Sequence, residues 1–369
     1  MRAIRLVFVV ALFAMLAPLG LGGQQARAAQ PLASCEPVTR PAATPVANQA
    51  PLKVSATPAS GLKKVSIGYI PVMNFAPMFV AKDLGYFAEQ GLDVELRTFA
   101  GGSEMIAQLA TNDLNVGMGG AGPGLFNAVN QGLPVKIIAP GHSEGNPVAT
   151  PLVVAKAKCE SGEILQVSDL KGKKVAINAP GATEYWLSQA LATGGLTMDD
   201  VDLQTLPFSD AVVALQSGAI DAAILGEPTA TLAEQQGIGV RLVSDFDVQG
   251  IQPTMVYASQ DFLKNDPEAA KGVAIGYMKA VRAIMERGFS DPEILPIIAT
   301  YTNLPEELIT ESVRPLFTVD GSINVDGLNT LQSFFRSMGE LNYDTDIDPN
   351  TMIDRTALDA ALQELDSSK

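Results

Sequence analysis

The sequence predicts an α/β protein of two lobes, each a mostly parallel sheet flanked by helices, joined by a hinge of two strands. Residues 69–85 and 178–190 each follow a hydrophobic strand into a short turn rich in Pro, Gly and Asn, and then directly into a helix. A second unit also occurs twice, because residues 103–118 and 210–223 both have the pattern of a helix, a polar turn and a strand. From Lys64 onward strand-like and helix-like segments alternate, which is typical of parallel sheets covered by helices. One α/β unit built twice predicts two lobes.

The length of the chain also favours two domains. Its 369 residues exceed one ordinary core but suit two domains with a leader and a linker. The chain is expected to cross between the lobes near residues 149–152 and 252–256, and two crossings make a hinge. The expected boundaries are a signal peptide at residues 1–28, a disordered linker rich in Pro, Ala and Thr at 29–61, lobe 1 at 62–150, lobe 2 at 151–253, and the return to lobe 1 with the C-terminal helices at 254–369.

Hydrophobic periodicity places the individual elements. Residues 76–90 have apolar side chains at helical spacing and are followed by Gly91, in the position of a C-cap glycine. Residues 328–338 and 356–365 are amphipathic, and we expect these two helices to cover the outside of the first lobe. The expected strands cover residues 65–70, 93–99, 116–119, 135–140, 152–154, 175–178, 202–207, 222–225, 240–244 and 254–259.

The N-terminus has the three parts of an export signal. Arg2 and Arg5 precede an apolar run over residues 6–21, and small residues follow it. The run is short for a permanent membrane span, and no later segment approaches its length. We therefore expect a secreted protein without a transmembrane helix, in the periplasm or on the extracellular face of the cell membrane.

One of the two cysteines lies in the linker and allows two incompatible roles. Residues 32–35 resemble the lipobox of bacterial lipoproteins, in which the cysteine is lipidated, although residues 24–31 separate it from the apolar run. Simple cleavage is favoured over lipidation for this reason. Alternatively, Cys35 pairs with Cys159 in an oxidising compartment. A lipidated Cys35 cannot form that bond, so these two interpretations exclude each other.

Composition excludes one class of partner. The formal charge is -15 and the pI is about 4.5. Nucleic acids bind basic surfaces, so we expect no nucleic-acid partner. His142 is the only histidine, and a single histidine makes a poor metal site, so we expect a loop residue, or else a ligand contact, with no metal and no cofactor.

Candidate ligand contacts lie where strands end, because solutes of open α/β sheets bind beyond the carboxyl ends of the strands. Asn74 and Phe75 occupy the first strand-to-helix turn. They are expected to hydrogen-bond and stack on a solute, or else are a turn-forming Asn and a core Phe. Gly102 and Ser103 offer N–H groups and a hydroxyl at a helix start, or simply cap that helix.

The strongest candidate segment is the turn and helix start at residues 180–186. Backbone N–H groups of Gly181, Ala182 and Thr183 are expected to face an anion or a carbonyl group. Tyr185 and Trp186 are expected to flank the solute, although Trp186, the only tryptophan, would equally suit a core.

Two further loops follow strands. Gly120 and Ala121 let a ligand approach the backbone closely, or form a tight turn. Glu227 stands between a glycine and a proline after a strand, and its carboxylate is expected to accept N–H donors of a heterocycle, or else is a solvated loop residue. Phe208 and Asp210 are weaker candidates.

A resemblance to a known family rests on motifs spread along the chain. The opening motifs are Gly68-Tyr69-Ile70 with Pro71, Asn74 and Phe75, followed by AKDLGYFAEQGLDV at residues 81–94. Later motifs are SDLKGKKV at residues 168–175, GAIDA at 218–222, GEP at 226–228 and DFLKNDP at 261–267. Together they make residues 62–290 resemble substrate-binding proteins of ABC importers, in the branch that serves nitrate, sulfonates, taurine and thiamine-pyrimidine precursors.

This resemblance implies a type II periplasmic-binding-protein fold and a transport function. In that family two lobes close over a solute, and the closed form docks on a membrane permease that works with an ATPase. The implied partners are therefore a small-molecule solute and an ABC permease with its ATPase, and the implied protein is a monomer without catalytic residues.

The chemistry of the candidates narrows the solute. They include Glu184 and Glu227 but no Arg or Lys, so nitrate, sulfonate or taurine would depend on helix ends and N–H groups alone. A neutral or cationic heteroaromatic solute with N–H groups, such as a pyrimidine or a flavin, fits better. Two other functions stay open. One is a ligand-sensing receptor. The other is an enzyme, because a eukaryotic branch that resembles this fold makes the thiamine pyrimidine itself. That branch uses histidines that this chain lacks, which argues against catalysis here.

Overall fold

The computed structural model describes residues 31–32, 34–36 and 61–367. The expected signal peptide and most of the expected linker lie outside these residues. Within the described ranges, no helix has the length and apolar character needed to cross a membrane.

The first sheet has five strands in the order β2-β1-β3-β11-β4. Strand β1 pairs in parallel with β2 and β3, whereas β11 runs antiparallel between β3 and β4. These strands are β1 Lys63–Tyr69, β2 Leu92–Thr98, β3 Val116–Gly120, β4 Val135–Pro140 and β11 Thr254–Ser259.

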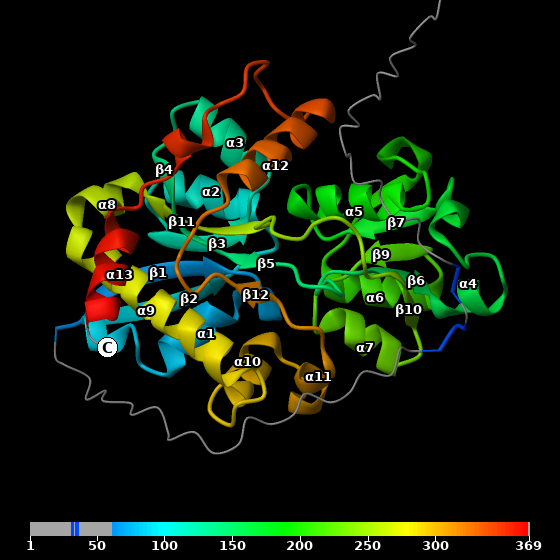
Figure 1. The fold of residues 1–369 in the computed structure, drawn as a ribbon, viewed down its shortest axis with the longest axis horizontal. Helices are drawn as coiled ribbons and strands as arrows, with labels where there is room; N and C mark the ends of the chain where they lie inside the picture. Colours follow the sequence, from blue (N-terminus) through cyan, green and yellow to red (C-terminus); the bar gives the residue numbers. More distant parts are fainter. Residues whose placement is uncertain (1–30, 33, 37–60, 368–369) are drawn as a thin grey trace, which may run out of the picture.

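The second sheet repeats this plan in the order β10-β6-β9-β7-β8. Here β7 pairs in parallel with β8 and β9, and β6 runs antiparallel between β9 and β10. Its strands are β6 Leu152–Ala155, β7 Lys174–Ile177, β8 Asp202–Thr205, β9 Ala222–Ile224 and β10 Gly239–Val243. In each sheet the single reversed strand is the first one after the chain crosses from the other sheet, and the rest are parallel. Figure 1 shows the two sheets side by side with helices around each, so the predicted two-lobed fold is confirmed.

Helices surround both sheets (Figure 1). The first lobe carries α1 Ala76–Asp83, α2 Gly102–Ala110, α3 Pro123–Asn130, α8 Gln260–Asn265, α9 Pro267–Arg287, α10 Leu295–Thr302 and α13 Thr356–Ser367. The second carries α4 Lys156–Glu160, α5 Ala182–Ala192, α6 Phe208–Ser217 and α7 Thr229–Gln235. The remaining elements are β5 His142–Ser143, α11 Glu306–Glu311, β12 Leu316–Phe317, α12 Val325–Ser337 and the short 3-10 helices Met73–Phe75, Ala88–Gln90, Val167–Leu170, Met198–Asp200 and Pro349–Met352.

Helix α9 organises the core of the first lobe. It begins with Pro267, because the first N–H of a helix has no internal partner to lose. Its buried face includes Tyr277, whose hydroxyl donates to the carbonyl oxygen of Pro140 at 2.7 Å. Pro140 ends β4, so α9 fixes the strand end from which the chain leaves for the second lobe.

The predicted helix over residues 76–90 is interrupted. Helix α1 ends at Asp83 because Gly85 adopts a φ of 75°, which a continuing helix does not allow. A separate 3-10 turn over Ala88–Gln90 follows, and it does end at Gly91, with a φ of 73°.

The two C-terminal helices differ from each other in what they contact. Helix α13 packs on α9 of the first lobe, as expected. The prediction for α12 is wrong in part, because this helix contacts both α3 of the first lobe and α5 of the second. The ring of Phe334 meets that of Tyr185 with centroids 5.3 Å apart, while Phe335 meets Phe126 at 6.1 Å. A segment distant in sequence therefore connects the two lobes.

The first described segment lies on the second lobe. The backbone N–H of Leu32 donates to the carbonyl of Leu165 at 2.7 Å, and Cys35 forms a disulfide with Cys159. This part of the expected disordered linker is therefore packed. Of the two roles open to Cys35, the structure has the disulfide, which leaves no thiol for a lipid.

Candidate functional site

A cavity lies between the two lobes and offers about 70 Å³ to the centres of water molecules. Both lobes line it. The predicted residues at its wall are Asn74, Phe75, Gly102, Ser103 and Gly120 from the first lobe, and Gly181, Ala182, Thr183 and Trp186 from the second. Their contact with a solute stays a prediction, but the fold brings them to one place.

Three helices begin at this cavity. Helices α2, α3 and α5 have Gly101, Gly122 and Gly181 as their N-caps, and no side chain of these residues caps the helix. Such helix starts present N–H groups and the positive end of the helix dipole. Ser103 is the second residue of α2, so the interpretation of Ser103 as its cap is wrong. At α5 the N–H of Gly181 donates to the Glu184 carboxylate at 2.6 Å, which occupies one of these donors.

The lobes touch through their backbones at the cavity wall. A Cβ placed on Gly122 would lie 3.0 Å from the Cα of Gly181 in the other lobe. A Cβ on Gly101 would lie 3.2 Å from the Cβ of Ala179. Because both approaches are tight, the described conformation is a closed one.

A buried polar network forms one side of the cavity. Nε2 of His142 lies 2.8 Å from Nδ2 of Asn74, and Nδ1 lies 2.8 Å from Oγ1 of Thr254. The backbone N–H of His142 also donates to Thr254 Oγ1 at 2.9 Å. Among the described residues, Oδ1 of Asn74 has no hydrogen-bond partner. His142 belongs to strand β5 and lines the cavity, so its prediction as a loop residue is wrong.

Glu144 is a site residue that the sequence analysis missed. Its buried carboxylate accepts from the N–H of Ala149 at 2.6 Å and from the indole N–H of Trp186 at 3.1 Å. Burial acts to raise the pKa of Glu144, but hydrogen bonds from His142, Thr150 and Ala149 outweigh it and hold the pKa below its ordinary value. The carboxylate therefore fixes the Trp186 ring from the segment that connects the lobes.

The charge of the cavity wall is simple. No Lys or Arg among the described residues lines it, and Glu144 is the only carboxylate that does. The wall thus combines N–H groups at helix starts with hydrogen-bond acceptors such as those of Asn74 and Glu144.

Two predicted contacts lie outside the cavity wall. Tyr185 points into the contact with α12, where its ring centroid lies 5.8 Å from that of Trp186, and burial raises the pKa of its hydroxyl. Ala121 is fully buried, and its N–H donates to the carbonyl of Pro253 at 2.8 Å. Both side chains serve packing. The neighbouring residues Trp186 and Gly120 line the cavity instead.

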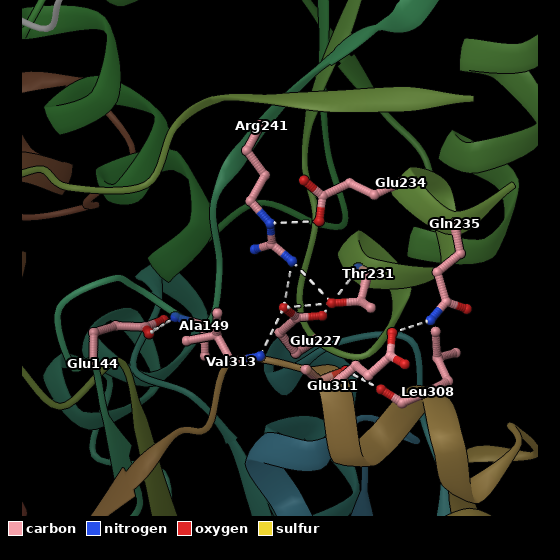
Figure 2. A network of polar contacts seen from close by, with 11 residues as sticks. Glu144, Ala149, Glu227, Thr231, Glu234, Gln235, Arg241, Leu308, Glu311 and Val313 are labelled. Atoms are coloured by element: carbon pink, nitrogen blue, oxygen red, sulfur yellow. Dashed lines mark hydrogen bonds and ion pairs between the residues drawn. The ribbon is translucent and has the colours of Figure 1, made fainter. Parts of the chain in front are cut away.

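Glu227 occupies a buried ion-pair network away from the cavity wall. Figure 2 shows Arg241 between Glu227 and Glu234. All three side chains are nearly inaccessible to solvent. Arg241 Nη2 lies 2.5 Å from Glu227, and its Nε lies 2.9 Å from Glu234. Thr231 donates its hydroxyl to Glu227 at 3.0 Å. The predicted role of Glu227 as a ligand contact is therefore replaced by a structural one.

The same glutamate joins the two lobes. Its carboxylate accepts from the N–H of Val313 at 3.1 Å (Figure 2). Its carbonyl accepts from the N–H of Met73 at 3.2 Å. Val313 follows α11 and Met73 begins the turn that carries Asn74. Glu227 thus holds the second lobe against two segments of the first.

Curated relatives are substrate-binding and transport proteins. The chain is 25% identical to the nitrate/nitrite binding protein NrtA of Nostoc sp., over 65% of this chain and 57% of the relative. It is 28% identical to the taurine-binding periplasmic protein of Escherichia coli, over 62% and 71%, and 29% identical to the riboflavin-binding protein RibY of Chloroflexus aurantiacus, over 69% and 68%. The chain spans about half the length of NrtA and of the bicarbonate-binding protein CmpA.

Solved structures share the fold. The alkanesulfonate-binding protein SsuA of Xanthomonas axonopodis matches 82% of this chain and 99% of its own, with a TM-score of 0.61 and 17% identity. The periplasmic nitrate-binding protein NrtA of Synechocystis matches 82% and 89%, with a TM-score of 0.67 and 18% identity. The resemblance to ABC substrate-binding proteins is confirmed. The NMT1-like family model matches residues 59–298, and the chain belongs to this family.

Proposed function

We propose that this protein is the extracytoplasmic solute-binding component of an ABC importer. Its two lobes close on a small solute, and the closed form delivers that solute to a membrane permease driven by an ATPase. The named relatives include binding proteins and also the ATP-binding proteins CmpC of bicarbonate transport and NrtC of nitrate import. The signal peptide expected at residues 1–28 and the disulfide of Cys35 support the oxidising compartment in which such proteins work.

The observation that carries this proposal is the cavity lined by both lobes. A solute held there contacts Asn74 on one lobe and the start of α5 on the other, so it binds the closed state better than the open one. Differential binding of this kind is what allows a solute to shift a hinge equilibrium. The proposal requires no covalent step.

We further propose a neutral or cationic solute with N–H donors, such as a heteroaromatic ring, over nitrate, taurine or a sulfonate. The unpartnered Oδ1 of Asn74 is a hydrogen-bond acceptor, and the Glu144 carboxylate lies beside it in the same wall. No Lys or Arg of the described wall balances a bound anion. An anion would depend on the helix starts alone.

The test is thermal unfolding of the purified protein with an aminopyrimidine, riboflavin, taurine, nitrate and bicarbonate. A solute at about 100 times its Kd stabilises the native state by about 2.7 kcal/mol. We expect the aminopyrimidine to raise the melting temperature, and we expect nitrate, bicarbonate and the sulfonate-bearing taurine to leave it unchanged. Stabilisation by taurine or nitrate alone would reject the solute class, and an unchanged melting temperature with every probe would remove the support for this cavity.

A matched pair of variants tests the site itself. Asn74→Ala removes the cavity acceptor and is expected to weaken binding about tenfold, since one hydrogen bond contributes about 1 kcal/mol or slightly more. Asn130→Ala changes an exposed asparagine at the end of α3 and is expected to bind as the wild type does. Equal affinities of the two variants would contradict the role of Asn74.

Two other functions make different predictions. A sensory receptor would bind the same solutes, but its closed form would associate with a signalling protein rather than with a permease. An enzyme of this fold is known in the desulfurization enzyme DSZB, which matches 82% of this chain with a TM-score of 0.60 and 14% identity. Solute recovered unchanged after incubation with the protein supports binding, and product formation would support an enzyme.

A further inference from the structure

A second cavity adjoins the first one between the lobes. It offers about 540 Å³ to the centres of water molecules, whereas the inner cavity offers about 70 Å³. Four residues line both cavities and form the partition between them, namely Ile70, Val72, Asn178 and Phe208. The two cavities are therefore consecutive compartments along one cleft.

The outer compartment is uncharged and mostly apolar, although Ser209, Gln236 and Asn303 are among its polar lining residues, and it spans the lobes. Phe99 and Tyr301 line it from the first lobe, and Phe208 and Leu232 line it from the second. None of its described lining residues is Lys, Arg, Asp or Glu. Val213 also lines it and is 63% exposed, so the compartment opens to solvent.

Size separates what the two compartments can hold. One water molecule needs about 10–15 Å³ of such volume, so the inner cavity holds about five to seven waters. A solute with more than a small head group must therefore extend past the partition. The outer compartment has several times that room, and the apolar part of its wall favours hydrocarbon over water.

We propose that the two cavities form one bipartite site for an elongated amphiphilic solute. A head with N–H donors occupies the inner cavity near Asn74 and Trp186, and an apolar tail passes Ile70 and Phe208 into the outer compartment. This inference rests on the proposed function and adds the tail to it. Because the tail contacts both lobes, a longer tail stabilises the closed form more.

The experiment measures the affinity of n-alkylamines from ethylamine to hexylamine. Trp186 is the only tryptophan and lines the inner cavity, so its fluorescence reports occupancy, and calorimetry provides an independent measurement. Each methylene buried in the outer compartment is expected to tighten binding about fourfold. A comparator, 6-amino-1-hexanol, carries a polar tail end and is expected to lose most of the gain.

Two variants locate the tail. Val213→Asp places a carboxylate in the wall of the outer compartment and is expected to abolish the gain with chain length, while the affinity for ethylamine is retained. Val319→Asp is the matched control, because Val319 is 46% exposed and lines neither cavity. It is expected to bind the whole series as the wild type does.

The outcomes separate this inference from the proposed function. Ethylamine binding without any gain along the series would overturn the bipartite site and leave the proposed head group intact. A series of n-alkylsulfonates that binds with the same gain, when the amines do not bind, would support the tail compartment and reject the proposed head. Equal loss of the gain in both aspartate variants would also overturn the assignment, since the effect would not be local.

Discussion

Replacement of Arg241 by methionine tests whether the network around Glu227 holds the structure together. Arg241 lies between two carboxylates, and the side chains of Arg241, Glu227 and Glu234 are 3%, 0% and 3% exposed. Arg241→Met keeps an unbranched side chain of similar length but removes the charge. Two buried carboxylates then face each other without their cation.

The expected magnitude follows from this burial. Breaking a buried ion pair by removing one partner costs about 3–5 kcal/mol, because the charge left behind is uncompensated. With an m value of about 3 kcal/mol/M, the urea midpoint of the affected transition falls by about 1–2 M. Replacing Glu227 and Glu234 by glutamine in the same variant removes the repulsion and is expected to restore part of this loss.

The assay is urea unfolding followed by circular dichroism, with Arg97→Met as the matched control. Arg97 pairs with Glu95 at 3.0 Å, but these side chains are 39% and 66% exposed. Solvent screens such a pair, so the control is expected to unfold as the wild type does. Folded Arg241→Met is expected to retain solute affinity, because Arg241 does not line the cavity.

Two results would refute this reasoning. Equal urea midpoints for Arg241→Met and Arg97→Met would show that the buried network contributes no stability. A normal midpoint combined with lost solute binding would return Glu227 and Arg241 to the ligand site, as the sequence analysis placed Glu227.

Three further predictions concern pH, redox state and closure. Burial raises the pKa of Glu184 to about 7 from an ordinary 4.5, so the folded state holds this proton more tightly than the unfolded chain does. The wild type is therefore expected to lose stability as the pH rises from 4.5 to about 7. The urea midpoint of Glu184→Gln is expected to fall less over this pH range. Parallel pH profiles of the two midpoints would contradict the prediction. The disulfide of Cys35 bridges a sequence separation of 124 residues, so Cys35→Ser is expected to cost up to roughly 5 kcal/mol in the chain-entropy model. Urea unfolding with and without reductant measures this, and a lipid adduct at Cys35 by mass spectrometry would exclude the bond. Gly122→Ala is expected to weaken solute binding with little effect on stability, because the new Cβ would lie 3.0 Å from the Gly181 Cα and hinder closure. The control is Gly145→Ala, whose Cβ would meet no atom nearer than 3.7 Å. Equal solute affinities of the two variants by calorimetry would refute the steric argument.

Local sequence signals predicted the parts of the site that depend on local structure. A strand followed by a turn and a helix start positions Asn74, and the same unit positions Gly181 and Thr183, because the carboxyl ends of parallel strands meet at one edge. These residues reach the cavity without help from distant segments.

Residues whose role depends on distant partners escaped prediction. Glu227 follows a strand as a ligand contact would, but its partners Arg241 and Val313 lie 14 and 86 residues away. Tyr185 was expected at the solute, yet α12 returns from the C-terminal part to cover it. Glu144 could have been suspected, because it follows His142 by two residues just beyond the end of β4.

Solute-driven closure is the central claim, and a distance measured across the cleft tests it most directly. Both cysteines of the chain are disulfide-bonded, so spin labels attach only to cysteines introduced at Leu133 of the first lobe and Lys171 of the second. Pulsed electron paramagnetic resonance then gives the distance between the labels with and without a solute whose binding Trp186 fluorescence has verified. We predict a shorter and narrower distance distribution in the bound protein. Identical distributions in the presence and absence of saturating solute would contradict the account.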